Sequence, residues 1–184
     1  MHNANSWFKI GAAIAFASLL ACNAGAAVPG ITFTICGSSP TPEVTALGRL
    51  PGVTVTGRVP SVIPYLNRAV VAVVPLRIGR GVQNKLLEAM AAGLPVVATT
   101  TARTGVAAEN GRDVFVADDP TDFAGAVVRL LRGRLLRETV GRAARAVVEA
   151  RYSWDRTLLR LEEILSEAAA GRARPAAALV GSEL

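Results

Sequence analysis

The sequence contains few residues that could hold a metal ion. Histidine occurs once, as His2, and cysteine twice, as Cys22 and Cys36, with no CxxC or HExxH spacing. These counts exclude most zinc sites, whose ligands recur at short fixed spacings. Both cysteines lie in apolar runs, where a buried free thiol is expected. The sequence therefore predicts no metal site.

Aromatic residues are scarce at 5%, and only 18% of the 184 residues are charged, whereas 51% are hydrophobic. This balance excludes a disordered chain and is typical of one compact α/β domain. The net charge of +6 comes almost entirely from arginine and suits phosphates or an anionic membrane surface. Because the arginines are scattered and not interleaved with aromatic residues, we do not expect nucleic acid as a partner.

Residues 1–27 allow two interpretations. Lys9 precedes the apolar run IGAAIAFASLLA and the small residues AGA at 24–26, a pattern that resembles a secretory signal. Leu19–Cys22 resembles a lipoprotein cleavage box, although the run is short for a membrane span. The other interpretation is an apolar helix at about 11–26 that packs on a sheet.

Short apolar runs alternate with helical patterns from residue 28 to residue 170, and a flexible tail is expected at 171–184. The pattern predicts strands at 31–36, 53–57, 69–75, 95–99 and 113–117, and helices at 41–49, 61–67, 82–92, 121–132, 135–150 and 154–169. Because the strands are apolar on both faces, they indicate a doubly wound parallel sheet. Such sheets bind ligands beyond the carboxyl ends of their strands, here in the loops after Cys36, Gly57, Pro75, Thr99 and Ala117.

One of these loops, LRIGRG at 76–81, opens a helix with the sequence VQNKLLEAMAA. Gly79 and Gly81 allow the backbone to approach a ligand closely, and a helix N-terminus attracts phosphate. The segment is neither a Walker loop nor a GxGxxG dinucleotide motif.

Three polar residues of this helix, Asn84, Lys85 and Glu88, share a face away from its apolar stripe. An ammonium group suits a diphosphate, and a carboxylate accepts two hydrogen bonds from a ribose or sugar diol. Lysine occurs only twice in the chain, which argues against generic surface charge at Lys85. The alternative is an ordinary surface pair at i and i+3 beside glycines that only punctuate a loop.

The run KLLEAMAAGLPVVAT, residues 85–99, resembles the EAMAxGxPVV signature of retaining GT-B glycosyltransferases of family 4. The flanking runs VTVTGRVPSVIPYLNRAVVAVVP, DVFVADDPTDFAGAVVRLL and RYSW are similar to the same family, so the resemblance covers about residues 28–166. Within the family, the chain most resembles sugar transferases of bacterial exopolysaccharide gene clusters. The resemblance implies a Rossmann-like C-terminal domain whose donor is a nucleotide-diphosphate sugar. It also implies a polysaccharide or lipid-linked acceptor and no cofactor.

The resemblance also implies roles for individual residues. Glu88 would bind the donor ribose, and the backbone of Gly57, Arg58 and Val59 would border the base. The donor diphosphate and sugar would lie near Lys85, Thr100 and the loop residues Gly79, Arg80, Gly81 and Asn84. Lys85 and Arg80 are the expected catalytic residues, because positive charge beside the diphosphate helps the sugar to depart.

The sequence departs from the family pattern in two places. The commoner motif has a glutamate eight residues before Glu88, where this chain has Arg80. In addition, we find no acceptor-binding N-terminal domain before residue 28. The first strand of the order 3-2-1-4-5-6, which is central in the sheet, is also not evident there, although residues 6–10 (SWFKI) are a candidate for it. We therefore expect the donor half of an enzyme, with a truncated remnant or half of a split enzyme as alternatives.

Nucleotide sugars are made in the cytosol, so the resemblance favours the apolar helix over the signal at the N-terminus. It implies a cytoplasmic location at or near the inner membrane face. An exported or lipid-anchored basic module is the alternative if residues 1–27 are a signal.

Overall fold

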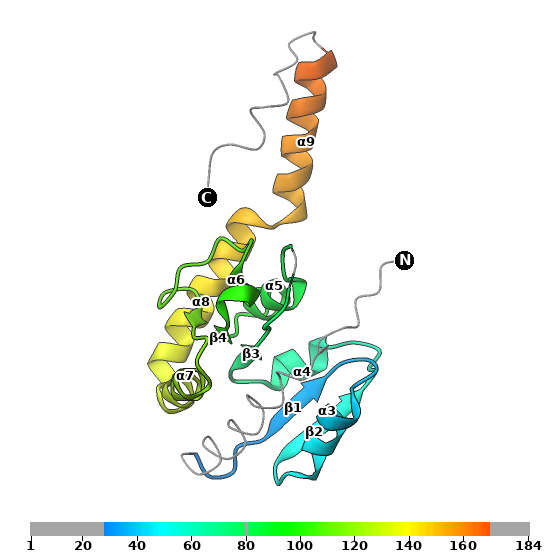
Figure 1. Ribbon diagram of the computed structural model, residues 1–184. Coiled ribbons are helices and arrows are strands. Elements are labelled where there is room, and N and C mark those ends of the chain that lie inside the picture. The colour runs from blue at the N-terminus through cyan, green and yellow to red at the C-terminus, as the bar shows by residue number, and fades with distance from the viewer. Residues whose placement is uncertain (1–27, 80, 170–184) are drawn as a thin grey trace. The chain divides into compact units, whose positions relative to one another are not determined.

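The computed structural model describes residues 28–79 and 81–169 (Figure 1). The expected helix or signal before residue 28, the tail at 171–184 and Arg80 lie outside the described residues. The chain divides into two compact units, residues 1–148 and residues 149–184.

The first unit contains a two-stranded parallel sheet of β1 (Phe33–Cys36) and β2 (Val53–Gly57), in which Phe33 is opposite Val53. The strands are joined by α3 (Pro42–Ala46) and the 3₁₀ turn η2 (Leu47–Arg49). Helix α3 begins where the Thr41 side chain accepts a hydrogen bond from the backbone N–H of Val44 at 3.4 Å. A buried cluster of Ile35, Val44, Leu47 and Val53 holds the turn on the sheet.

A second parallel sheet has the order β3 (Ala72–Val74), β4 (Val96–Ala98), β5 (Phe115–Val116). Helix α4 (Ile63–Arg68) precedes β3, α5 (Asn84–Ala91) joins β3 to β4, and α6 (Thr100–Arg103) follows β4. All three residues of the central strand β4 are buried, as expected for a strand covered on both faces.

Helix α7 (Pro120–Arg132) begins at Asp119, whose side chain accepts hydrogen bonds from the backbone N–H groups of Thr121 and Asp122 at 2.8 and 3.2 Å. A capping carboxylate followed by a proline in the first turn is a common start for a helix. The core of this sheet consists of Val97 with Phe123, Val127 and Leu130 of α7. Phe33 of β1 packs against this cluster and against the cluster under β1 and β2, so both cores share one side chain.

Helix α8 (Arg134–Arg151) is amphipathic, with Val140, Gly141 and Ala144 buried. The last helix, α9 (Trp154–Ala169), has exposed apolar side chains that include Leu158, Leu161 and Leu165. Among the described residues, no helix is both long and apolar enough to cross a membrane.

The parallel strands and alternating helices confirm the predicted α/β class. Every expected strand is present, but β1, β3, β4 and β5 are shorter than their apolar runs. The four-residue helix α6 was not predicted, because the threonines and glycine of the run TTTARTG are typical of a loop. Within residues 28–79 and 81–169, the strands form two separate sheets, and the division lies between β1 and β3. In the strand order 3-2-1-4-5-6, this is the position of the first strand.

Candidate functional site

The loop after β3 leads into α5 without a side-chain cap on the helix. Gln83 is the N-cap residue in extended conformation, and its side-chain Nε2 donates to the carbonyl oxygen of Gly81 at 3.2 Å. Gly81 has a φ of +66°, which a residue with a Cβ rarely adopts. At Gly79, a Cβ would approach Gln83 Nε2 to 2.9 Å. Gly81 is therefore favoured by the backbone of this loop, whereas a Cβ on Gly79 would only displace the end of the flexible Gln83 side chain.

The loop after β3 lies against the start of the next loop, after β4. The Thr99 hydroxyl donates a short hydrogen bond to the carbonyl oxygen of Leu76, and the backbone N–H of Thr99 donates to Val74 at 3.3 Å. A Cβ on Gly79 would lie 3.4 Å from Thr101 Cγ2, and one on Gly105 would lie 3.4 Å from Val82 Cγ2. These contacts join the carboxyl ends of β3 and β4 into one rim at the N-terminus of α5.

Lys85 and Glu88 lie one turn apart on α5, and both are half-buried. Burial lowers the pKa of Lys85, and the charge of Glu88 partly offsets this shift. Burial likewise raises the pKa of Glu88 against the opposing effect of Lys85. Among the described atoms, the buried Oε2 of Glu88 has no hydrogen-bond partner. An unsatisfied buried acceptor costs free energy, so this oxygen is suited to a ligand that donates hydrogen bonds.

Thr100 begins α6 on the same rim, and a carboxylate holds it there. Its backbone N–H donates to Asp118 Oδ1 at 2.8 Å, and its hydroxyl donates to Asp118 Oδ2 at 2.6 Å. Asp118 was not predicted to take part in the site, although its position just after an expected strand was a signal.

Arg103, at the end of α6, was also passed over among the many arginines. Its guanidinium donates to the carbonyl oxygen of Ala108 at 3.0 Å, while its buried Nε has no partner among the described atoms. Arg103 therefore adds a second cation, after Lys85, to the helices that follow β3 and β4.

The residues predicted to border the base lie on the other sheet. Gly57 ends β2 at a φ of +66°, and Val59 and the exposed Arg58 follow it. Asn84 is exposed at the first turn of α5. The described residues contain no cluster of three His, Cys, Asp or Glu side chains that could bind a metal.

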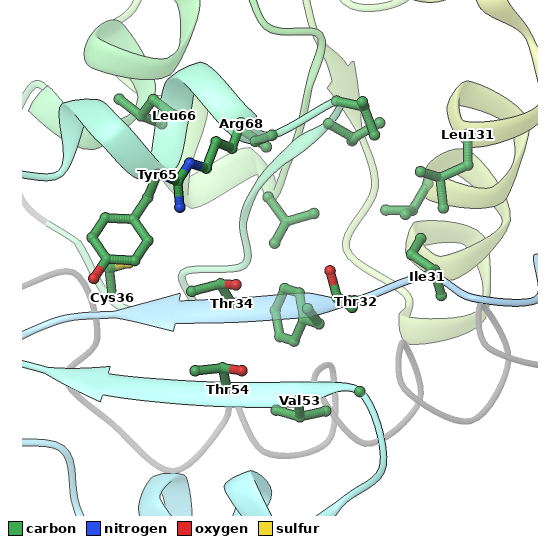
Figure 2. Close-up of a pocket in the computed structure, with 18 of the residues that line it drawn as sticks. Ile31, Thr32, Thr34, Cys36, Val53, Thr54, Tyr65, Leu66, Arg68 and Leu131 are labelled. Carbon is green, nitrogen blue, oxygen red and sulfur yellow. The ribbon is translucent and has the colours of Figure 1, made fainter.

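A cavity of about 630 Å³ lies away from all the predicted site residues. It is bounded by β1, β3, α4 and α7, and Figure 2 shows Thr34 of β1 and Arg68 of α4 pointing into the space between them. The cavity and the rim at α5 are thus separate features of the first unit.

Solved structures of glycosyltransferases share this fold. The C-terminal domain of a glycosyl transferase group 1 family protein (LpcC) from Francisella tularensis matches with a TM-score of 0.63 and 17% identity, covering 76% of this chain and 79% of that domain. HepE from Anabaena, in complex with UDP, matches with a TM-score of 0.72 and 17% identity over 89% of this chain and 50% of HepE. Sucrose-phosphate synthase from Thermosynechococcus elongatus matches with a TM-score of 0.63 and 22% identity over 83% and 42%. The chain thus spans about half the length of HepE and less of the synthase.

These similarities define a Rossmann-like domain of the GT-B glycosyltransferase fold. The family model described as glycosyl transferases group 1 matches residues 14–133, more than half of the sequence. The chain belongs to this family of glycosyltransferases, which confirms the family and enzyme class predicted from KLLEAMAAGLPVVAT. No curated protein matches the chain.

Proposed function

We propose that the rim at α5 binds a nucleotide-diphosphate sugar and that this chain is the donor-binding half of a glycosyltransferase. The observation that carries the proposal is the buried, unpartnered Glu88 Oε2 one turn from the half-buried Lys85. A carboxylate next to an ammonium group at the start of an uncapped helix matches a ligand with a diol next to a diphosphate.

The proposed roles of the residues follow from their places on the rim. Glu88 accepts hydrogen bonds from the donor ribose, and the backbone at Gly79, Gly81 and Asn84 faces the diphosphate or sugar. Lys85 supplies positive charge where the diphosphate departs, so that neither a metal nor another cofactor is required. Arg80 lies outside the described residues, and its proposed role as a second positive charge rests on the sequence alone. Thr100 reaches the ligand only from a position that Asp118 fixes.

The base is proposed to lie beside Gly57, Arg58 and Val59. These residues stand at the carboxyl end of β2, the end at which parallel α/β sheets bind ligands. HepE has the same fold and was solved with UDP and with UDP-glucose. Its ligands support a nucleotide sugar as the kind of donor to test first.

The test is calorimetric titration of the chain with UDP, GDP and UDP-glucose, comparing Glu88→Ala with Glu162→Ala. Glu162 is an exposed glutamate of α9 in the second unit and serves as the matched control. We expect binding that weakens at least about 10-fold in Glu88→Ala, since a lost hydrogen bond to a charged group costs about 1.5–3 kcal/mol. Equal affinity in both variants, or no nucleotide binding by folded protein, would refute the proposal.

A second candidate function is a non-catalytic remnant or one half of a split enzyme. The division of the sheet between β1 and β3 among the described residues motivates it. Donor hydrolysis, measured by release of the nucleoside diphosphate, separates the two candidates. Turnover by the chain alone would eliminate the remnant, whereas turnover only with an added acceptor-binding half would establish the split enzyme.

We propose a cytoplasmic enzyme at or near the inner membrane face, acting on a polysaccharide or lipid-linked acceptor in exopolysaccharide synthesis. The family match begins at residue 14, inside the apolar run, so part of this run belongs to the sequence that the family shares. An intact Met1 end, found by mass spectrometry of the native protein in its host, supports this location. A chain cleaved before Cys22 would instead support the exported module.

A further inference from the structure

Two polar side chains are buried in the described part of the chain, and they are held in different ways. The carboxylate of Asp113 accepts hydrogen bonds from the backbone N–H of Glu109 and from Nε of Arg112, both at 2.9 Å, so its partners lie in its own turn. Thr99, which is 2% exposed, instead donates to Leu76, 23 residues earlier. Its buried hydroxyl therefore couples two distant segments of the chain.

The Thr99 hydroxyl both donates and accepts a hydrogen bond. It donates to the carbonyl oxygen of Leu76 and accepts from the backbone N–H of Ala102 at 3.3 Å, so it caps α6 while it holds the other loop. An aspartate would cap a helix equally well, but an ionised carboxylate has no proton to donate. The bond to Leu76 is therefore what a hydroxyl adds at this position.

Leu76 is the residue at which the glycine loop leaves the sheet. Its side chain is 8% exposed, whereas the next three residues, 77–79, are all exposed. The backbone N–H of Leu76 donates to the carbonyl oxygen of Val74 at 3.0 Å, and that of Thr99 donates to the same oxygen at 3.3 Å. Thr99 thus binds the carbonyl oxygens of both Val74 and Leu76, where the path of the exposed loop is set.

The glycine loop and the start of α6 form the two sides of the rim, at the same end of the paired strands β3 and β4 (Figure 1). The two sides lie close together, since a Cβ on Gly79 would lie 3.4 Å from Thr101 Cγ2. A ligand that contacts both sides binds more tightly when their separation is fixed beforehand, because ordering a loop on binding costs entropy.

We propose that Thr99 is a positioning residue for the diphosphate of the donor, acting through Leu76 on the glycine loop and through Ala102 on α6. This role rests on the donor site proposed above for the rim. Because Thr99 is buried, it orders the groups that bind the diphosphate without contacting the ligand itself. The nucleoside is bound through Glu88, inside α5, and does not depend on the loop.

Titration calorimetry separates a positioning role from a purely structural one. UDP and uridine, or GDP and guanosine, are titrated into Thr99→Val, which lacks the hydroxyl, and into Thr99→Ser, which keeps it. We expect Thr99→Val to bind the nucleoside diphosphate at least about 10-fold more weakly and the nucleoside within about 2-fold of the unmodified chain. Thr99→Ser should bring both affinities to within about 2-fold of the unmodified chain.

Thr45→Val is the matched control. Thr45 of α3 has a hydroxyl that also donates to a backbone carbonyl oxygen, that of Thr41 at 3.0 Å, and it lies outside the rim. Both affinities should be unchanged in this variant. An equal loss of nucleoside and diphosphate binding in Thr99→Val, or no loss of either, would overturn the role of Thr99. So would a Thr99→Ser variant that binds as weakly as Thr99→Val.

Hydrogen exchange tests the loop without any nucleotide. We expect the backbone N–H groups of Leu76 and Ala102 to exchange at least about 10-fold faster in Thr99→Val than in the unmodified chain. The N–H of Leu94, which donates to Ala89 at 3.1 Å, should be unchanged and controls for global unfolding. Unchanged exchange at Leu76 with intact nucleotide binding would overturn the role of Thr99 alone. Faster exchange in a chain that binds no nucleotide would overturn the donor site and keep Thr99 as the residue that orders the loop.

Discussion

Lys85 and Glu88 lie one turn apart on α5, and burial lowers the pKa of Lys85 and raises the pKa of Glu88, so that it favours the uncharged form of each. Each charge partly offsets the effect of burial on the other, but the Glu88 Oε2 has no partner among the described atoms. A pair that served only stability would be expected to satisfy this oxygen. The arrangement instead resembles that of groups positioned to bind a ligand. Such groups often lower the stability of the ligand-free protein, as is common at functional sites.

The first prediction is that Glu88→Gln makes the ligand-free protein more stable at neutral pH. The raised pKa of Glu88 means that its folded form binds a proton more tightly than its unfolded form does. Stability from this group is thus present at pH values below the ordinary glutamate pKa and is lost as the pH rises through the folded pKa. We expect the free energy of unfolding of the variant to be higher by about 1 kcal/mol at pH 7 and unchanged near pH 4. The gain is smaller than the full cost of an unsatisfied buried carboxylate, because Glu88 is only half-buried. Thermal melts of both proteins from pH 4 to pH 8 measure the difference, and a gain independent of pH would contradict the assignment.

The second prediction separates the proposed roles of the pair. Lys85→Met should weaken binding of a nucleoside diphosphate at least about 10-fold, or about 1.4 kcal/mol, and leave binding of the matching nucleoside unchanged. Glu88→Gln should weaken both ligands by the same factor, because both carry the ribose. Competition titrations with uridine and UDP, or guanosine and GDP, give the four ratios. A loss of nucleoside binding in Lys85→Met would remove the diphosphate role.

The third prediction uses two glycines that lie inside helices. A Cβ on Gly141 of α8 would overlap the carbonyl oxygen of Gly93, whereas a Cβ on Gly125 of α7 meets nothing within 4 Å. We expect Gly141→Ala to cost about 3 kcal/mol or more through overpacking, and Gly125→Ala to add about 0.5–1 kcal/mol through helix propensity. Urea unfolding of the two variants measures both changes. A Gly141→Ala variant as stable as the unmodified protein, or more stable, would show that α8 does not pack closely on the Gly93 turn.

The fourth prediction concerns Thr100 and Asp118. Thr100→Val removes the hydroxyl that donates to Asp118 at 2.6 Å but keeps the shape of the side chain. We expect a loss of about 1 kcal/mol, because the bond is charge-assisted but exposed to solvent. A double-mutant cycle with Asp118→Asn should show that the two losses are not additive. Full additivity would mean that the side chains act independently and that Asp118 does not position the start of α6.

Local patterns in the sequence predicted most of the helices and strands of this fold. The apolar β-branched run at Val53–Gly57 is a strand over the predicted residues, and α7 begins at Pro120, one residue before the predicted start. The run at 69–75 predicted a longer strand than the observed Ala72–Val74. The strand is shorter because the residues on either side of it have no neighbouring strand to pair with among the described ones. Helix α6 was missed, since its start depends on Thr99 accepting from the backbone of Ala102.

What the sequence determined by itself is the α/β class and the candidate face of α5, because alternation of apolar runs and the spacing of Asn84, Lys85 and Glu88 are local properties of the chain. Only the tertiary structure decided which polar atoms lack partners and which are already engaged. Glu88 Oε2 is unsatisfied because burial removes water without supplying a donor, whereas Thr100 is held by a carboxylate 18 residues away. The same holds for the division of the sheet between β1 and β3 among the described residues, because the pairing of strands depends on contacts between distant segments.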